Sequence, residues 1–443
     1  MITDLIKEFS KDFLEKSKDR KIHIVSHYDT DGISSAAILL KTMKRLQKQF
    51  SLKIIKQLTE EEIKLFPEDR IIFMLDLGSN SLESLSKLKT QIFIIDHHEI
   101  NYNQAFPNIN IVNPHLINEY ENLCTSELSY LFSQAINQEN KDLSNLSILG
   151  MIGDTMEKNI TKTREKIIRE SDIKVKRGIL IYPSTRPIDK ALEYSPRPFI
   201  PGITGNQKAI YELLRDIGIE KTWKNFKALI DLDEQEMKKF VTAIMLRLHS
   251  TEKNSDFIGN LYLIKLFNKI EDAREISAII NACSRMGKPE TALMLCLGNI
   301  NARRKAERMY FKYRQHIIAG LRFIDKNEKI LGREYVIINA KDNIKDTIIG
   351  TLTSILSFSS VYKEGTIIIA MAYDNDKIKV SMRMAGHSSS SRNLKEFIDS
   401  ITCSIGGIAG GHKEAAGCVI SRDSENKFIE LVKKKLEYEL IKV

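Results

Sequence analysis

Residues 21–47, KIHIVSHYDTDGISSAAILLKTMKRLQ, contain the pattern that decides the fold. The apolar run KIHIVS (21–26) leads into an acidic turn, and SSAAILLKTMKRLQ (34–47) then has helical spacing of its apolar residues. The alternation continues with three more apolar runs, RIIFML (70–75), QIFII (91–95) and NIV (110–112), and with helical patterns at 79–89 and 124–136. Short buried strands that alternate with helices predict an α/β fold with a parallel sheet over residues 20–155.

The rest of the chain divides into two further parts. Residues 156–325 are predicted to be mainly helical, and they end in a long basic connecting helix at 301–323. From residue 326 strands such as GTIIIAMAYD (365–374) alternate with helices again, and the glycine-rich turn GGIAGGHKEAAG (406–417) precedes the last strand. We therefore expect three parts: an α/β domain at 1–155, a helical insertion with its connecting helix at 156–325, and a smaller α/β domain at 326–443.

The composition excludes several classes of protein. Of the 443 residues, 42% are hydrophobic and 28% are charged, which is typical of a globular chain and not of a disordered or fibrous one. No apolar run reaches the roughly 18 residues of a membrane-spanning helix, and the charged N-terminus does not resemble a signal peptide, so we expect a cytoplasmic protein. The five scattered cysteines indicate reduced thiols, and the net charge of +9 weakly favours a polyanionic partner.

Aspartates follow the apolar runs. Asp29 and Asp31 come after the first run, Asp76 after the second, Asp96 after the third, and Asp154 after the apolar stretch GMIG. The carboxyl ends of parallel strands share one edge of a sheet, so we expect these groups to converge. Clustered carboxylates repel one another, and a hard divalent cation resolves that conflict by accepting oxygen ligands.

Histidines accompany the same aspartates. His27 precedes Asp29, and His97 and His98 follow Asp96. Mixed imidazole and carboxylate ligands favour Mn²⁺, Fe²⁺, Co²⁺ or Zn²⁺, and two metals about 3.5–4 Å apart are a recurring device for hydrolysis of phosphate esters. An isolated aspartate at a strand end is more often a helix cap or a turn residue. The repeated coincidence of these motifs with apolar runs favours the metal site.

The motifs together resemble those of the DHH phosphoesterase superfamily. The matching segments are HYDTDGISSAAI (27–38), LDLG (75–78), IIDHH (94–98) and IGD (152–154), and GGHKEAAG (410–417) resembles the signature of the associated DHHA1 domain. The resemblance implies two Mn²⁺ ions, with Mg²⁺ or Co²⁺ as alternatives. It assigns His27, Asp29 and Asp76 to one ion and Asp31, Asp76, His97 and Asp154 to the other, with Asp76 bridging. His98 would face the substrate phosphate and act in catalysis with Asp96.

The resemblance also indicates substrate-binding residues. Glycines let backbone N–H groups approach a phosphate, so Gly410, Gly411 and His412 are expected to bind it. Arg383 resembles a phosphate-binding arginine of the family, and Arg285 is a further candidate. The active site would then lie in the cleft between the DHH and DHHA1 domains.

The long insertion indicates the branch of the family. ALEYSPRPFIPGITG (191–205) and INACSRMGKPETALMLCLG (280–298) resemble segments of archaeal RecJ-like single-strand exonucleases. The expected activity is a two-metal exonuclease of single-stranded DNA or RNA that releases mononucleotides in DNA replication or repair. Two alternatives remain open, an oligoribonucleotide or cyclic-dinucleotide phosphodiesterase and a replisome scaffold that binds the GINS complex. The polarity of degradation and the choice between DNA and RNA stay open as well.

The connecting helix contains basic and aromatic residues together. RRKAERMYFKYR (303–314) has six Lys or Arg, interleaved with Tyr310, Phe311 and Tyr313. Basic grooves with stacking aromatics bind single strands without reading their sequence. Aromatic residues at helical spacing also commonly face a core while the charges face water. Both interpretations remain open at this point.

Overall fold

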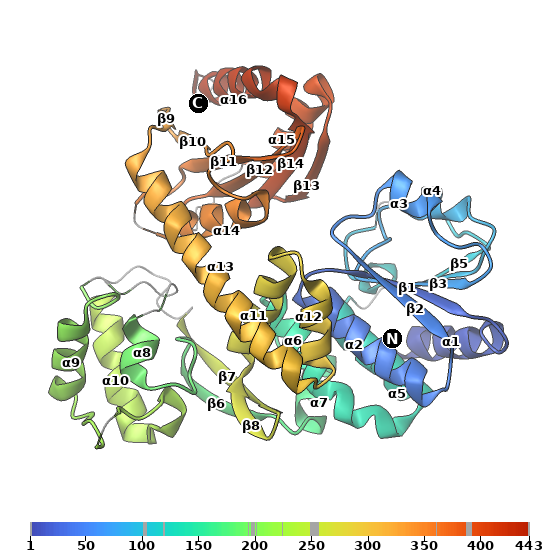
Figure 1. The fold of residues 1–443 in the computed structure, drawn as a ribbon, viewed down its shortest axis with the longest axis horizontal. Helices are drawn as coiled ribbons and strands as arrows, with labels where there is room; N and C mark the ends of the chain where they lie inside the picture. Colours follow the sequence, from blue (N-terminus) through green and yellow to red (C-terminus); the bar gives the residue numbers. More distant parts are fainter. Residues whose placement is uncertain are drawn as a thin grey trace. The chain divides into compact units, whose positions relative to one another are not determined.

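The computed structural model describes residues 2–100, 104–117, 120–193, 195, 200, 202–223, 225–248, 257–359, 361–386 and 392–441. The chain forms two compact units, Met1–Tyr310 and Phe311–Val443 (Figure 1). The helix α13 (Ile300–Lys326) begins in the first unit and ends in the second. In the part of the chain that the structure describes, no helix is both long and apolar enough to span a membrane.

A parallel sheet of five strands organises the first unit, in the order β2-β1-β3-β4-β5. Its strands are β1 (Ile22–His27), β2 (Phe50–Ile55), β3 (Ile71–Leu75), β4 (Ile92–Ile95) and β5 (Ile109–Val112). Every residue of β3 and β4 is buried, as expected for central strands covered on both faces. The predicted parallel α/β fold is confirmed. The edge strand β2 was not predicted, because its half-exposed residues do not form a continuous apolar run.

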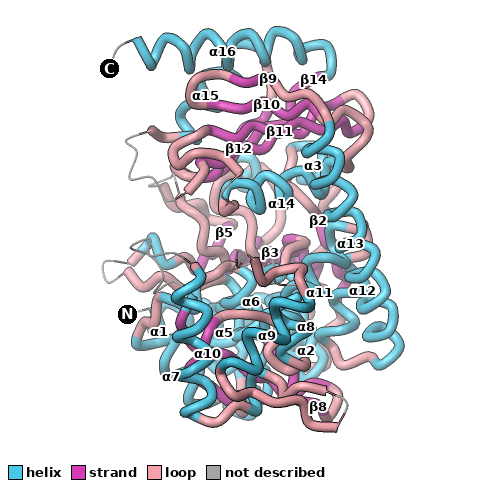
Figure 2. Tube along the Cα trace, turned by 90° about the vertical axis from the view of Figure 1, so that its left-hand side faces the viewer, coloured by secondary structure: helices cyan, strands magenta, loops and turns pink. Residues whose placement is uncertain are grey.

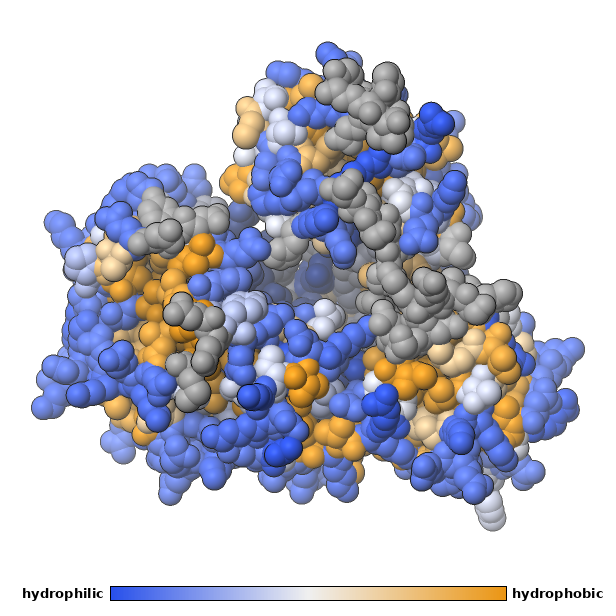
Figure 3. Space-filling view, turned by 180° about the vertical axis from the view of Figure 1, so that it is seen from behind, coloured by the Kyte–Doolittle hydropathy of each residue, from blue (hydrophilic) through white to orange (hydrophobic). Residues whose placement is uncertain are grey.

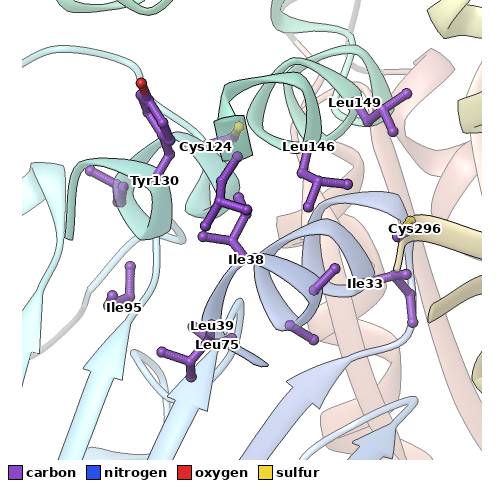
Figure 4. Packing of buried hydrophobic residues seen from close by; sticks show 14 of the residues in the cluster. Ile33, Ile38, Leu39, Leu75, Ile95, Cys124, Tyr130, Leu146, Leu149 and Cys296 are labelled. Carbon is purple, nitrogen blue, oxygen red and sulfur yellow. The ribbon is translucent and has the colours of Figure 1, made fainter. Parts of the chain in front are cut away.

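Helices cover both faces of this sheet (Figure 1). One face carries α1 (Ile2–Lys16), α2 (Thr30–Arg45) and α5 (Thr125–Ile136), and the other carries α3 (Glu60–Lys64) and α4 (Leu82–Ser86). A further helix, α6 (Ser144–Gly153), packs on α2 and α5. Figure 4 shows Ile38 and Leu39 of α2 between the strand residue Leu75 and Leu146 of α6. The first helix after β1 is therefore buried between the sheet and a second helical layer.

The insertion contains helices and a small sheet. Its elements are α7 (Lys162–Glu170), β6 (Lys174–Ile179), α8 (Ile188–Glu193), α9 (Gln207–Asp216), α10 (Glu234–Arg247), β7 (Ile258–Leu266), β8 (Lys269–Asp272), α11 (Ala273–Arg285) and α12 (Pro289–Cys296). The segment is mainly helical, as predicted, but the antiparallel sheet β6-β7-β8 within it was not predicted. Its hairpin turns at Phe267 and Asn268, both with positive φ, a signal that the apolar pattern alone does not contain. Residues of α11 and α12 share the hydrophobic core of α2 and α6.

The second unit is built on a mixed sheet of six strands, in the order β13-β14-β12-β11-β10-β9. The strands are β9 (Ile330–Leu331), β10 (Tyr335–Asn339), β11 (Ile367–Asp374), β12 (Lys377–Met384), β13 (Ile408–His412) and β14 (Ala415–Ser421). One face carries α14 (Asp346–Ser357), and the other carries α15 (Leu394–Ile405) and α16 (Glu425–Ile441) (Figure 2). The predicted glycine-rich turn is corrected here, because Gly410 and Gly411 lie on the edge strand β13 and Gly417 lies on β14, its partner in a hairpin.

Short 3-10 helices connect several of these elements: η1 (Pro114–Leu116), η2 (Gln138–Leu143), η3 (Met156–Lys158), η4 (Leu229–Asp231) and η6 (Arg422–Ser424). Hydrophilic residues cover much of the described surface on the face drawn in Figure 3. The exposed large apolar residues include Leu65, Trp223 and Leu246, which come from separate parts of the chain. The charged fraction of the sequence is thus largely a property of the surface.

Candidate metal centre

The turn between β1 and α2 places the first two candidate ligands side by side. His27 is the last residue of β1, and Asp29 caps the N-terminus of α2 by accepting a hydrogen bond from the Gly32 backbone N–H at 3.0 Å. A Cβ atom at Gly32 would lie only 2.4 Å from the carbonyl oxygen of His27. The glycine therefore permits a turn in which Nδ1 of His27 lies 3.0 Å from Oδ2 of Asp29.

Asp31 lies in the first turn of α2 and is fully buried. Its two carboxylate oxygens accept hydrogen bonds from the backbone N–H groups of Thr125 at 2.7 Å and Ser126 at 2.9 Å, at the start of α5. The N-terminus of a helix stabilises a negative charge. Burial and the nearby charge of Asp76 nevertheless raise the pKa of Asp31 to about 6.

Asp76 lies between the two groups of candidate ligands. It follows β3 directly, is 2% exposed, and adopts a left-handed backbone conformation with φ of 61°. One carboxylate oxygen is 3.2 Å from Nδ1 of His27, and the other is 3.5 Å from Nε2 of His97. Thr125 donates its hydroxyl to the second oxygen at 3.2 Å. Residues other than glycine are uncommon in this conformation, and such residues cluster at functional sites.

The Asp96 carboxylate is buried under the loop that it begins. It accepts hydrogen bonds from the backbone N–H groups of Ser79, His97 and His98, and from Nδ1 of His98 at 2.7 Å. Burial raises the pKa of Asp96, but His98 and the Ser79 N–H outweigh it and lower the pKa overall. Burial lowers the pKa of His98, but the Asp96 charge raises it overall. Asp96 therefore fixes the orientation of the half-exposed His98 ring through Nδ1, and Nε2 is the ring nitrogen that can contact a substrate.

Asp154 was expected at the end of a strand, and the structure corrects this. It is the C-cap residue of α6, since the apolar run before it is a buried helix. A Cβ atom at Gly150 would lie 2.0 Å from Oγ of Ser126 and 2.3 Å from Oδ1 of Asp31. At Gly153 it would lie 2.6 Å from the Thr30 side chain. The two glycines let α6 approach α2 and α5 closely enough to bring Asp154 to the sheet edge.

Two sets of side chains result, each able to hold a cation. The first contains His27, Asp29 and Asp76, and the second contains Asp31, His97 and Asp154; within each set the ligand atoms lie within 4.8 Å of one another. A third, overlapping set contains Asp76, His97 and His98.

The charges of these side chains conflict when no cation is bound. Burial and the charges of Asp31 and Asp29 raise the pKa of Asp154 well above its usual range. Burial lowers the pKa values of His27 and His97, but neighbouring carboxylates raise both well above the ordinary value. Imidazole and carboxylate groups converge here, and the carboxylates outnumber the imidazoles. The residues therefore fit divalent transition-metal ions.

Sequence reasoning missed the residues that support the Asp96 loop. Asn113 is fully buried and donates its Nδ2 hydrogens to Oγ of Ser79 and to the carbonyl oxygen of His98, both at 2.9 Å. A signal was available, because Asn113 follows β5 directly, just as Asp96 follows β4.

The predicted phosphate-binding residues of the second unit lie on β12 and β13, which are separated by β14. Arg383 on β12 pairs with Ala415 on β14, and Ala415 pairs with His412 on β13, so the three backbones form one row. Gly411 has φ of 126°, and a Cβ atom there would lie 2.3 Å from the Ala415 carbonyl oxygen. At Gly410 a Cβ atom would meet open space. Arg285 is the last residue of α11, in the first unit.

The basic connecting helix contains aromatic residues of two kinds. Tyr310 packs against the core of the first unit, and the buried Tyr313 hydroxyl lies 2.8 Å from Oγ1 of Thr351. Phe311 is 63% exposed. Both tyrosines therefore pack in the protein interior, as one of the two interpretations predicted, whereas Phe311 is exposed to solvent.

Comparison with known proteins places the motifs in a family. Residues 21–153 match the DHH family, N-terminal domain; residues 181–261 match the DHH-CID domain; and residues 333–438 match the DHHA1 domain. An uncharacterized protein of Methanocaldococcus jannaschii is 28% identical over 425 residues, which are 93% of this chain and 92% of that protein. A Bacillus subtilis prophage protein named as a single-strand DNA-specific exonuclease, YorK, is 27% identical over 158 residues, 32% of this chain and 27% of that one.

Solved structures share the fold. RecJ from Thermus thermophilus in complex with Mn²⁺ has a TM-score of 0.62 at 17% identity, with 97% of this chain covered. The match spans 54% of that RecJ chain, about half of its length. CDC45 from Entamoeba histolytica has a TM-score of 0.63 at 13% identity over 98% of each chain. The chain thus contains a DHH family N-terminal domain, a DHH-CID domain and a DHHA1 domain in this order, and it has an α/β fold like that of RecJ.

Proposed function

We propose that this protein is a two-metal-dependent phosphodiesterase that degrades single-stranded nucleic acid from an end and releases mononucleotides. One observation carries the proposal: two sets of imidazole and carboxylate ligands converge on one edge of the sheet and approach each other through Asp76. The first set would hold one Mn²⁺ ion and the second set the other, with Mg²⁺ or Co²⁺ as substitutes.

The side chains of the site have separate tasks in this reaction. Two divalent cations would supply Lewis acidity and an activated water for attack on phosphorus. Asp76 holds the two ligand sets together, because its two carboxylate oxygens face His27 and His97. His98, oriented by Asp96, presents Nε2 as a donor to a phosphate oxygen or to the leaving oxygen. Its raised pKa favours the protonated form that such a donor needs.

One comparison supports a nucleic-acid substrate, and another supports Mn²⁺ as the metal. The relative YorK is named as a single-strand DNA-specific exonuclease, and the RecJ structure contains Mn²⁺. Gly410, Gly411 and His412 lie on β13 and Arg383 lies on β12, with β14 between the two strands. In this proposal these residues would bind a terminal phosphate. Arg285 stays a weaker candidate for a contact with the strand.

End-labelled single-stranded DNA and RNA oligomers, incubated with Mn²⁺ or Mg²⁺, test the proposal. We expect mononucleotides from one end only, which would also reveal the polarity. Asp154→Ala should retain the fold and lose this activity. If no linear strand is degraded and a cyclic dinucleotide is, the cyclic-dinucleotide alternative is correct.

A second candidate function is a scaffold role in the replisome, bound to the GINS complex. The shared fold with CDC45 over 98% of both chains favours it. The complete ligand sets favour catalysis, and one protein can do both. A pull-down with purified GINS, using wild-type protein and Asp154→Ala, separates the roles. Binding that survives the substitution supports a scaffold role, and the absence of binding rejects it.

A further inference from the structure

One ion pair lies entirely inside the protein beside the second ligand set. Arg164 of α7 and Glu127 of α5 have side chains that are 0% exposed. Arg164 Nε donates to one carboxylate oxygen at 2.7 Å and Nη2 to the other at 2.6 Å, a bidentate pair. A buried pair of this kind is weak evidence for stability by itself, so its other contacts matter.

The same guanidinium holds two loops by their backbone carbonyls. Nη2 donates to the carbonyl oxygen of Asn122 at 2.7 Å, in the loop that leads into α5. Nη1 donates to the carbonyl oxygens of Met156, at 3.1 Å, and Asn159, in the segment that follows Asp154. One side chain therefore joins the segment before α5 to the segment after α6.

Each of these segments places a ligand of the second set. Glu127 also accepts the Cys124 N–H at 2.9 Å and so fixes the first turn of α5, whose next two N–H groups hold Asp31. The segment after α6 begins with Asp154 and then Thr155 in a left-handed conformation, with φ of 58°. None of these Arg164 hydrogen bonds is made to a candidate ligand. They connect the segment that positions Asp31 to the segment that begins with Asp154.

We infer that Arg164 is a positioning residue for the second metal ion: with Glu127 it sets the separation between Asp31 and Asp154. The inference rests on the proposed metal centre. It predicts an effect on one ion only, because His27 and Asp29 are held by β1 and α2. The start of α5 also contacts Asp76 through Thr125, but at the oxygen that faces His97 of the second set. Lysine would keep the charge but could not form the planar fork that engages all these oxygens at once.

Binding of Mn²⁺ alone to the metal-free full-length chain tests the inference without any nucleic acid. Equilibrium dialysis gives the number of ions, and electron paramagnetic resonance of free Mn²⁺ gives their affinities. Wild-type protein should bind two ions. Arg164→Lys should bind the first with unchanged affinity and the second roughly 10- to 100-fold more weakly, the usual effect of losing a residue that orients a ligand. Glu127→Gln should do the same and serves as a second variant if Arg164→Lys does not fold.

Ile167→Ala is the matched control for a general loss of stability. Ile167 lies one turn further along α7 and is buried in the same core, but it has no polar atom to hold a loop. This variant should lower the melting temperature and still bind both ions with wild-type affinities. The inference is overturned if folded Arg164→Lys binds both ions normally, if both affinities fall together, or if Ile167→Ala weakens the second ion equally. Wild-type protein that binds fewer than two ions would also overturn it. Normal binding of two ions without hydrolysis would contradict only the proposed function.

Discussion

Nε2 of His97 lies 3.2 Å from Oδ2 of Asp154, although one residue follows a strand and the other ends a helix. His97 reaches this position because the Asp96 carboxylate holds its backbone N–H at 2.8 Å. Asp154 reaches it because Gly150 and Gly153 let α6 pack closely against α2 and α5. The second ligand set therefore depends on helix packing as much as on the sheet edge, and the predictions below test both.

Metal removal should change the order of stability of wild-type protein and Asp154→Asn. Without cations, the raised pKa of Asp154 means that its charge costs folding free energy at neutral pH, so the neutral variant should melt at a higher temperature. At Mn²⁺ about 100-fold above its dissociation constant, each site adds about 2.7 kcal/mol, and wild-type protein should then be the more stable. Melting curves in EDTA and in Mn²⁺ check this, and an unchanged order in the two buffers would contradict it.

Asp96 and His98 should act as one unit. Asp96→Asn and His98→Ala should each lower kcat by about 10²- to 10⁴-fold, because the first loses the orientation of the ring and the second loses the ring. The double variant should be little worse than either single variant, since the same contribution is removed only once. Steady-state kinetics of the three variants measure the coupling. Mn²⁺ binding by His98→Ala should stay normal, and a lost ion would instead identify His98 as a ligand.

Gly150→Ala and Gly350→Ala should change stability in opposite directions. Both glycines lie within helices, where alanine is favoured by roughly 0.5–1 kcal/mol. At Gly350 the nearest atom to a new Cβ is 3.6 Å away, so Gly350→Ala should stabilise the protein by about that amount. At Gly150 the new Cβ collides with Ser126 and Asp31, and overpacking should cost about 1–3 kcal/mol. Urea denaturation gives both values, and weaker Mn²⁺ binding should accompany the first variant only.

Glu275 should make stability fall as the pH rises. Burial, Glu271 and Asp272 raise its pKa to about 7, although the pair with Arg186 opposes them. A carboxyl group with a raised pKa in the folded state contributes fully at low pH, and that contribution is lost as the pH rises from about 4.5 through about 7. The loss is at most on the order of 3 kcal/mol. Glu275→Gln should therefore match wild-type protein at about pH 5 and exceed it at about pH 8 in denaturant titrations. Equal stability of the two proteins under the more alkaline condition would contradict the shift.

Much of the first sheet was predictable from single segments. The strands β3 and β4 are buried on both faces, so each appears as an unbroken apolar run that needs no knowledge of its neighbours. The strand β2 and the hairpin of β7 and β8 could not be found in this way, because an edge strand is only partly apolar and a hairpin depends on its turn. Asp154 was placed on the wrong kind of element for a related reason, since a short buried apolar run fits a helix or a strand equally well.

The sequence by itself determined the fold class and the identity of the candidate ligands, because the motifs follow apolar runs and the carboxyl ends of parallel strands share one edge. Only the tertiary structure decided that Asp154 reaches the site from the end of a helix, that Asp96 orients His98, and that Asn113, Glu127 and Arg164 support the loops. The physical reason is distance along the chain. A ligand at the end of a strand is encoded locally, whereas a carboxylate held by the first N–H groups of a distant helix depends on how the helices pack.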